Sequence, residues 1–151
     1  MWKNAKGVGA QALETLNLFT VSSASATSVY DSSYAAANAF NGVNTQKGWV
    51  PANTDSTKTL RADLGSSKSI KGIVVGFVGT TASYSYNEAS ITVQYSSNDS
   101  AYTTVGTFTL KAISNYYSQA FIPVDFDARY VKLTFSKVNN YGVKASFLGA
   151  I

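Results

Sequence analysis

The sequence predicts an all-β domain built as a two-layer sandwich. From residue 19 onward, short alternating or β-branched segments follow one another, and clusters of Asn, Asp, Ser and Gly separate them. The chain has 151 residues, of which 45% are hydrophobic and 13% are charged. Such a chain is long enough to bury one core and too hydrophobic to stay disordered. We therefore expect one sandwich domain over residues 19–151, preceded by an extension of residues 1–18.

The extension contains the helical segment of the prediction. Residues 8–19, VGAQALETLNLF, place Val8, Ala12 and Leu16 at four-residue spacing. Chain ends fray unless they are tied down. We expect the extension to act as a docking arm that contacts another subunit or the surface of its own domain.

Eight segments have the pattern of strands. They are residues 19–23, 59–64, 70–79, 89–97, 103–110, 118–124, 129–136 and 143–151. Two of them alternate clearly enough to predict a buried face. The residues expected in the core from these two strands are Ile91, Val93, Tyr95, Val131, Leu133 and Phe135.

The charge pattern argues against a nucleic-acid partner. The formal net charge is +4, but the lysines are scattered singly and form no basic run. Arg61 and Arg129 are the residues suited to bidentate phosphate contacts. Both fall in predicted strands, where we expect structural salt bridges instead.

The sequence lacks the residues that several kinds of functional site require. Cysteine and histidine are absent, so neither a disulfide nor a thiolate metal site is expected. The acids are dispersed, and we interpret the close pair Asp125 and Asp127 as turn formers, so we expect no enzyme. No apolar run has the length of a signal peptide or of a membrane span of about 20 residues. We expect no membrane partner, and a virion or extracellular location reached by lysis or assembly.

Four segments in order resemble the discoidin family, also called coagulation-factor type C domains, which overlaps with the family 32 carbohydrate-binding modules. They are SSYAAANAFNGVNTQKGW at 32–49, LRADLGSSKSIKGIVV at 60–75, ITVQYSSNDSAYTTV at 91–105 and ARYVKLTF at 128–135. The resemblance covers residues 19–150. It implies an eight-stranded jelly-roll sandwich that binds ligand through loops at one end.

The resemblance also implies a calcium site in the loop at residues 38–50. Neutral oxygens for it would come from Ala37, Asn41, Asn44 and Thr45. Calcium takes six to eight oxygens and depends on carboxylate charge, yet Asn41 stands where the family has Asp, and the final ASFLGAI contains no Glu. Two interpretations remain open: a hydrogen-bonded loop without metal, so that the domain has no cofactor, or a weak calcium or sodium site.

Two aromatic residues, Phe40 and Trp49, flank this polar loop. Under either interpretation we expect them to anchor the loop on the sandwich. Each would contribute about 2 to 3 kcal/mol through burial.

The resemblance places ligand-binding side chains in loops at residues 31–34, 49–58, 80–88 and 139–142. A sugar site needs an aromatic face for the pyranose ring and planar polar groups for its hydroxyls. The candidates are Tyr34, Asn53, Tyr84, Tyr86, Asn140 and Tyr141. Tyr141 is the favoured stacking residue, although a tyrosine there could simply cover the sheet end. The usual galactose site is not expected, because no His is present and neither Arg lies in a tip loop.

Two functions are consistent with the sequence. In the first, the domain is a non-catalytic decoration module of a virion, on a phage head or tail, that binds cell-surface glycans and attaches to other subunits through residues 1–18. In the second, it is a structural virion or assembly protein that keeps the fold without ligand binding.

Overall fold

The computed structural model describes residues 17–41, 48–79, 85–114, 117–136 and 141–150. In these residues the chain forms strands and short 3-10 helices, and no α-helix. The elements are β1 (Leu18–Phe19), β2 (Ser23–Ala26), η2 (Ser32–Tyr34), η3 (Ala36–Phe40), β3 (Thr59–Gly79), β4 (Ser85–Ser96), β5 (Thr103–Ser114), β6 (Tyr117–Phe135) and β7 (Tyr141–Leu148). Within the same ranges, no helix has the length and apolarity to cross a bilayer.

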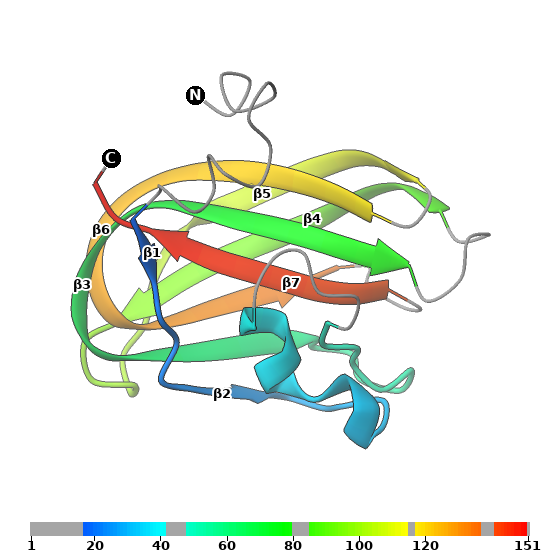
Figure 1. The fold of residues 1–151 in the computed structure, drawn as a ribbon, viewed down its shortest axis with the longest axis horizontal. Helices are drawn as coiled ribbons and strands as arrows, with labels where there is room; N and C mark the ends of the chain where they lie inside the picture. Colours follow the sequence, from blue (N-terminus) through cyan, green and yellow to red (C-terminus); the bar gives the residue numbers. More distant parts are fainter. Residues whose placement is uncertain (1–16, 42–47, 80–84, 115–116, 137–140, 151) are drawn as a thin grey trace.

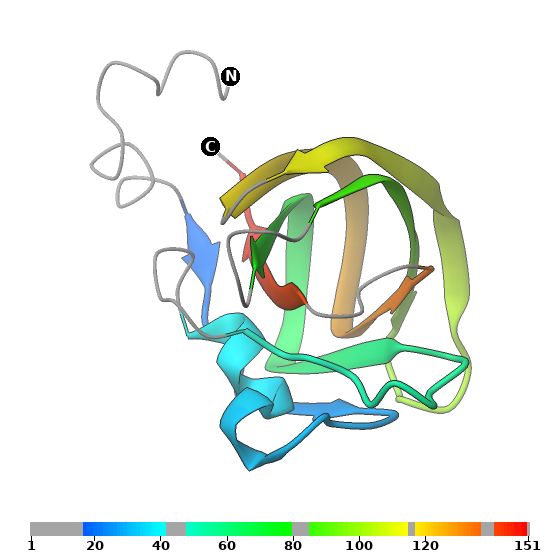
Figure 2. The ribbon, with the colours of Figure 1, turned by 90° about the vertical axis from the view of Figure 1, so that its right-hand side faces the viewer.

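All strand pairs are antiparallel, and the strand order is β1-β7-β3-β6-β4-β5, with β2 added alongside β3. The long strands β3 and β6 bend and so belong to both layers, as their curvature at the left of Figure 1 shows. They pair once at Thr59–Asp63 and again from Lys68 onward, with a register shift between the two stretches. Seen from the end, the strands wrap around a common core (Figure 2). The predicted all-β jelly-roll sandwich is confirmed.

The bends join predicted strand segments that the sequence pattern separates, while the segment predicted at 19–23 corresponds to two short strands, β1 and β2. The segments predicted at 59–64 and 70–79 are both parts of β3, and those at 118–124 and 129–136 are both parts of β6. Gly65 lies at the β3 bend with a φ of 81°, a left-handed conformation that glycine adopts without strain. The prediction of a turn at Asp125 and Asp127 is wrong, because β6 continues through both residues: Asp127 pairs with Ser69 of β3, and Asp125 lies at a register shift within the strand.

The predicted helix at 8–19 is wrong where the structure describes it. Leu18 and Phe19 form β1 and pair with Leu148 and Phe147 of β7. The open edge of β7 offers these residues backbone hydrogen bonds, which outweighs a weak local helical preference. Residues 8–16 lie outside the described residues.

The core follows the predicted alternation. Ile91, Val93, Val131, Leu133 and Phe135 are all buried. The sixth predicted core residue, Tyr95, is half-buried and stacks on Phe126 with ring centroids 4.4 Å apart.

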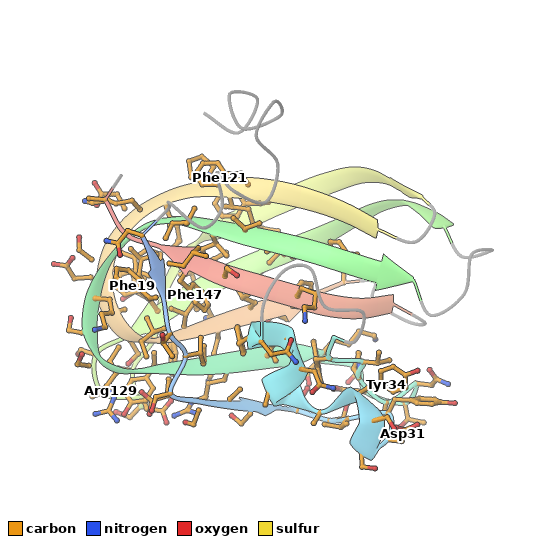
Figure 3. The ribbon with its side chains drawn as sticks, viewed as in Figure 1. Phe19, Asp31, Tyr34, Phe121, Arg129 and Phe147 are labelled. Atoms are coloured by element: carbon orange, nitrogen blue, oxygen red, sulfur yellow. The ribbon has the colours of Figure 1, made fainter. Side chains whose placement is uncertain are left out.

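Both arginines form the structural ion pairs that the sequence predicts. Arg129 Nε donates to Asp63 Oδ1 at 2.8 Å, across the bend shared by β3 and β6. Its position at the left of Figure 3 marks that bend. Arg61 donates to both carboxylate oxygens of Asp99, in the turn between β4 and β5. These contacts occupy the two guanidinium groups with carboxylates of the same chain.

Candidate ligand-binding end of the sandwich

The strand register brings several loops to one end of the sandwich, at the right of Figure 1, which we call the loop end. Tyr141, the first residue of β7, lies opposite Gly79, the last residue of β3. Trp49 forms a β-bridge with Val143, two residues further along β7. β3 therefore ends, and β7 begins, at the same end of the sandwich as Trp49.

The predicted ligand residues differ in how far the structure describes them. Tyr34 ends η2, and Asn53 is exposed in the turn that follows Trp49. Tyr86 lies in β4 opposite Ile113, and Tyr141 begins β7. Tyr84 and Asn140 lie outside the described residues. The assignment of ligand binding to these residues stays a prediction.

A second tyrosine joins Tyr34 at this end. Tyr30 is 54% exposed, and its ring meets that of Tyr34 edge-on with centroids 6.2 Å apart. Between them, Asp31 caps η2 by accepting a hydrogen bond from the Ser33 backbone N–H at 2.7 Å. Figure 3 places Tyr34 and Asp31 together beside η2. Tyr30 was not predicted; the available signal was an aromatic residue directly before an Asp that suits a helix cap.

Backbone hydrogen bonds join the tyrosine segment to the turn that carries Asn53. The Tyr30 N–H donates to the Val50 carbonyl at 2.7 Å, and the Val50 N–H donates to the Tyr34 carbonyl at 3.3 Å. The two segments run side by side along one border of the loop end in Figure 2. Among the described residues, the Asn53 amide has no hydrogen-bond partner. The arrangement thus combines an exposed aromatic face with an available amide.

The carboxylate of Asp55 connects the segment before Tyr30 to the turn that carries Asn53. It accepts hydrogen bonds from the hydroxyls of Thr27 (2.5 Å), Ser28 (2.6 Å) and Thr57 (2.8 Å). The backbone N–H groups of Thr57 and Lys58 donate to it as well. Burial alone would raise the pKa of Asp55, but these hydrogen bonds outweigh it and hold the pKa well below its usual value. Asp55 therefore organises the loop end as an anion.

We expect Asp55→Ala to lower the free energy of unfolding by about 2 kcal/mol, because several donors lose a charged acceptor. Asp55→Asn, which keeps one oxygen, should lose less. Urea unfolding at neutral pH measures both variants. An alanine variant as stable as wild type would show that water replaces the carboxylate fully.

The same contacts predict a pH dependence. Because the pKa of Asp55 is lower in the folded state than the ordinary 3.8, its stabilisation is complete above that value. It is lost as the pH falls through the lowered folded-state pKa. The difference in unfolding free energy between wild type and Asp55→Asn should therefore shrink below about pH 4. A difference that stays constant down to low pH would contradict this assignment.

An outer hollow of about 370 Å³ adjoins the Asp55 network on the solvent face of β2, β3, β6 and β4. It is lined by Ser25, Ala26, Thr27, Thr57, Thr59, Arg61, Gln94, Lys132 and Thr134. The Thr59 and Thr134 hydroxyls bond to each other at 2.9 Å. The Lys132 ammonium lies 4.0 Å from the centre of the Tyr102 ring. Most polar groups of the hollow thus contact other residues of the same chain.

The loop predicted to hold a metal contains an internal contact with β7. Lys144 is fully buried, and its Nζ donates to the Asn38 carbonyl at 2.9 Å and to the Asn41 side-chain oxygen. Burial lowers the pKa of Lys144 to about 8. Ala37 is exposed on η3, and Asn44 and Thr45 lie outside the described residues. The described ranges hold no group of three or more Asp, Glu, His or Cys residues close enough to share an ion.

The two aromatic anchors behave as predicted. Trp49 is fully buried, and its indole Nε1 donates to the Ser28 carbonyl at 2.8 Å. Phe40 stacks on Phe147 of β7 with centroids 5.8 Å apart. Both residues therefore hold the loop that they flank against the sandwich.

Comparison with solved structures finds the same fold in carbohydrate-binding modules. A family 32 module of AlyQ, in complex with 4,5-unsaturated mannuronic acid, is 18% identical with a TM-score of 0.66, over 88% of this chain and 98% of that one. A family 32 module of C. perfringens NanJ, in complex with galactose, is 19% identical with a TM-score of 0.66, over 87% and 97%. Chitosan-binding module 1 of a Paenibacillus chitosanase/glucanase is 22% identical with a TM-score of 0.62, over 87% and 96%.

Sequence comparison agrees with the structural one. A search of curated proteins finds no match. The sequence model of the F5/8 type C domain matches residues 22–147, which is most of the chain. The resemblance noted in the sequence is confirmed, and the chain belongs to the F5/8 type C domain family.

Proposed function

We propose that this domain is a non-catalytic module that binds cell-surface glycans at its loop end. The observation that carries the proposal is the exposed Tyr30 ring, which meets Tyr34 edge-on and is joined through backbone hydrogen bonds to the turn carrying Asn53. An aromatic face covers the apolar side of a pyranose, and an amide can bond its hydroxyls. Because the two segments are hydrogen-bonded to each other, little ordering is needed on binding.

The solved relatives support the ligand class. The AlyQ module is in complex with 4,5-unsaturated mannuronic acid, the NanJ module is in complex with galactose, and the Paenibacillus module is a chitosan-binding module. These sugars differ in charge and in hydroxyl pattern, so they support a glycan ligand without selecting one sugar. For this chain we therefore propose a glycan ligand, bound by Tyr30, Tyr34 and Asn53, without naming the sugar.

Three acids of the described residues, Asp55, Asp63 and Asp99, support a non-catalytic role. Asp55 organises two loops, whereas Asp63 and Asp99 pair with arginines. A glycosidase needs two carboxylates facing one sugar-sized space. These three carboxylates instead bond to groups of their own chain.

The second part of the proposal is that the module belongs to a virion, on a phage head or tail, and attaches through residues 1–18. It rests on the composition and on the N-terminal extension. Where the structure describes this extension, the Gly149 N–H donates to the Asn17 carbonyl at 2.8 Å and Leu18 pairs with Leu148. Deleting residues 1–16 should then abolish incorporation into particles while the sandwich unfolds at an unchanged temperature. Normal incorporation of the deleted protein would refute this part.

A glycan array followed by titration of the best ligand tests the glycan site. Tyr30→Ala and Tyr34→Ala should each weaken binding at least about tenfold, which corresponds to about 1.4 kcal/mol. Tyr102→Ala is the matched control, because Tyr102 lies at the opposite end of the β4–β5 hairpin and should leave affinity unchanged. Full binding by both loop-end variants would place the site elsewhere. Failure to bind any glycan at millimolar concentration would favour the purely structural role.

A further inference from the structure

Lys144 of β7 is fully buried, which is rare for a lysine because its ammonium loses its hydration. Such a group is tolerated only where oxygens replace the lost water. Two of those oxygens are known: Nζ donates to the Asn38 carbonyl at 2.9 Å and to the Asn41 side-chain oxygen. Both belong to the polar loop that the sequence suggested as a cation site. That loop therefore does hold a cation, and the cation is covalently part of the chain.

The adjacent residue of β7 holds the other side of the same loop. The Val143 N–H donates to the Trp49 carbonyl at 2.8 Å, and the Trp49 N–H donates to the Val143 carbonyl at 3.0 Å. Asn41 and Trp49 flank the segment 42–47 on its two sides. Consecutive residues of one strand thus fix both flanks of the loop to the sandwich. These bonds hold the polar loop to β7, which is the role that a bound metal ion would otherwise have.

Calcium does not fit this arrangement. A calcium ion needs six to eight oxygens, with carboxylates among them. Of the expected ligands, the Asn41 oxygen already accepts from the Lys144 ammonium. A divalent ion at this oxygen would lie next to a buried positive charge, and the repulsion is weakly screened away from water. The C-terminal strand, from which the family resemblance expects a glutamate, instead contributes the lysine.

We propose that the Lys144 ammonium takes the place of a metal ion and holds η3 and Asn41, at the start of the polar loop, against β7. The loop end consequently keeps its shape whether or not calcium is present. This inference goes beyond the proposed glycan binding and does not depend on it, because its readout is stability rather than ligand affinity.

Thermal unfolding in excess calcium chloride and in EDTA tests the proposal on the full chain. The wild-type protein should unfold at the same temperature in both solutions. Lys144→Met should unfold several degrees lower in both, because the oxygens of Asn38 and Asn41 lose their donor. Lys71→Met is the matched control, since Lys71 is exposed and pairs with Asp125 at the surface. A wild-type midpoint that rises with calcium would overturn the proposal.

Asn41→Asp gives the sharpest distinction and changes an exposed residue, so the fold should survive. If Lys144 is the cation, the new carboxylate pairs with it and raises the unfolding temperature equally in calcium and in EDTA. If the loop is a weak metal site, the carboxylate instead supplies missing charge, and the increase appears only with calcium. Equal stabilisation in both solutions supports the proposal, and calcium-dependent stabilisation or no stabilisation overturns it.

Discussion

Trp49→Ala is expected to lower the free energy of unfolding by about 3 to 5 kcal/mol. The indole is fully buried and lies against Phe135, with ring centroids 6.0 Å apart. Alanine would leave a large cavity at the junction of the loop and the core. It would also leave the Ser28 carbonyl without the hydrogen bond that it accepts from the indole N–H at 2.8 Å. Urea unfolding followed by far-ultraviolet circular dichroism measures the loss.

Trp49→Phe separates the two contributions. Phenylalanine fills most of the space but donates no hydrogen bond, so we expect a smaller loss, of about 1 to 3 kcal/mol. Tyr30→Ala is the surface control, because Tyr30 is more than half exposed and its removal leaves the core intact. A Trp49→Ala variant within about 1 kcal/mol of wild type would mean that the indole does not anchor the loop.

The position of Trp49 links stability to the proposed ligand end. Its indole bonds to Ser28, whose hydroxyl in turn bonds to Asp55 and to the Ala52 backbone N–H. Tyr30 follows two residues after Ser28. Loss of the indole should therefore disturb the tyrosine pair as well as the core, whereas loss of Tyr30 should affect ligand binding alone.

The strands could be predicted because alternation records which face of a strand is buried. Val131, Leu133 and Phe135 face the core as their spacing requires. The bends of β3 and β6 could not be predicted in the same way. Their continuity depends on pairing between Asp63 and Tyr130 before the bend and between Lys68 and Ala128 after it. Such pairing joins residues far apart in the chain, and local patterns do not record it.

The loop end was predicted less completely, for a similar reason. Tyr34 and Asn53 come from loops that the family resemblance marks, and the structure joins their segments by hydrogen bonds. Tyr30 was missed because it lies one residue before the loop at 31–34 that the family resemblance marks. Lys144 was missed because it alternates with the buried Val143 and Ala145, so the strand pattern predicts that it faces water. Its burial comes instead from the loop that supplies the oxygens of Asn38 and Asn41.

Gly48→Ala is expected to destabilise the protein by about 3 kcal/mol or more, because a methyl group has no room there. A Cβ on Gly48 would lie 2.5 Å from the Val143 carbonyl oxygen, 2.7 Å from its nitrogen and 2.8 Å from the Gly142 carbonyl carbon. These are backbone atoms of β7, which cannot rotate away as a side chain can. The Trp49–Val143 bridge must therefore open, or β7 must move.

Gly106→Ala provides the matched control for this prediction. Gly106 also lies in a strand, β5, but its added Cβ would meet only the Phe108 ring, at 3.7 to 3.8 Å, which is an ordinary contact. Its unfolding free energy should stay within about 0.5 kcal/mol of wild type. Urea unfolding of both variants decides the matter. Equal unfolding free energies for the two variants would show that β7 can move to accommodate the methyl group without loss of stability. The Trp49–Val143 bridge would then not be needed to hold the loop against the sandwich.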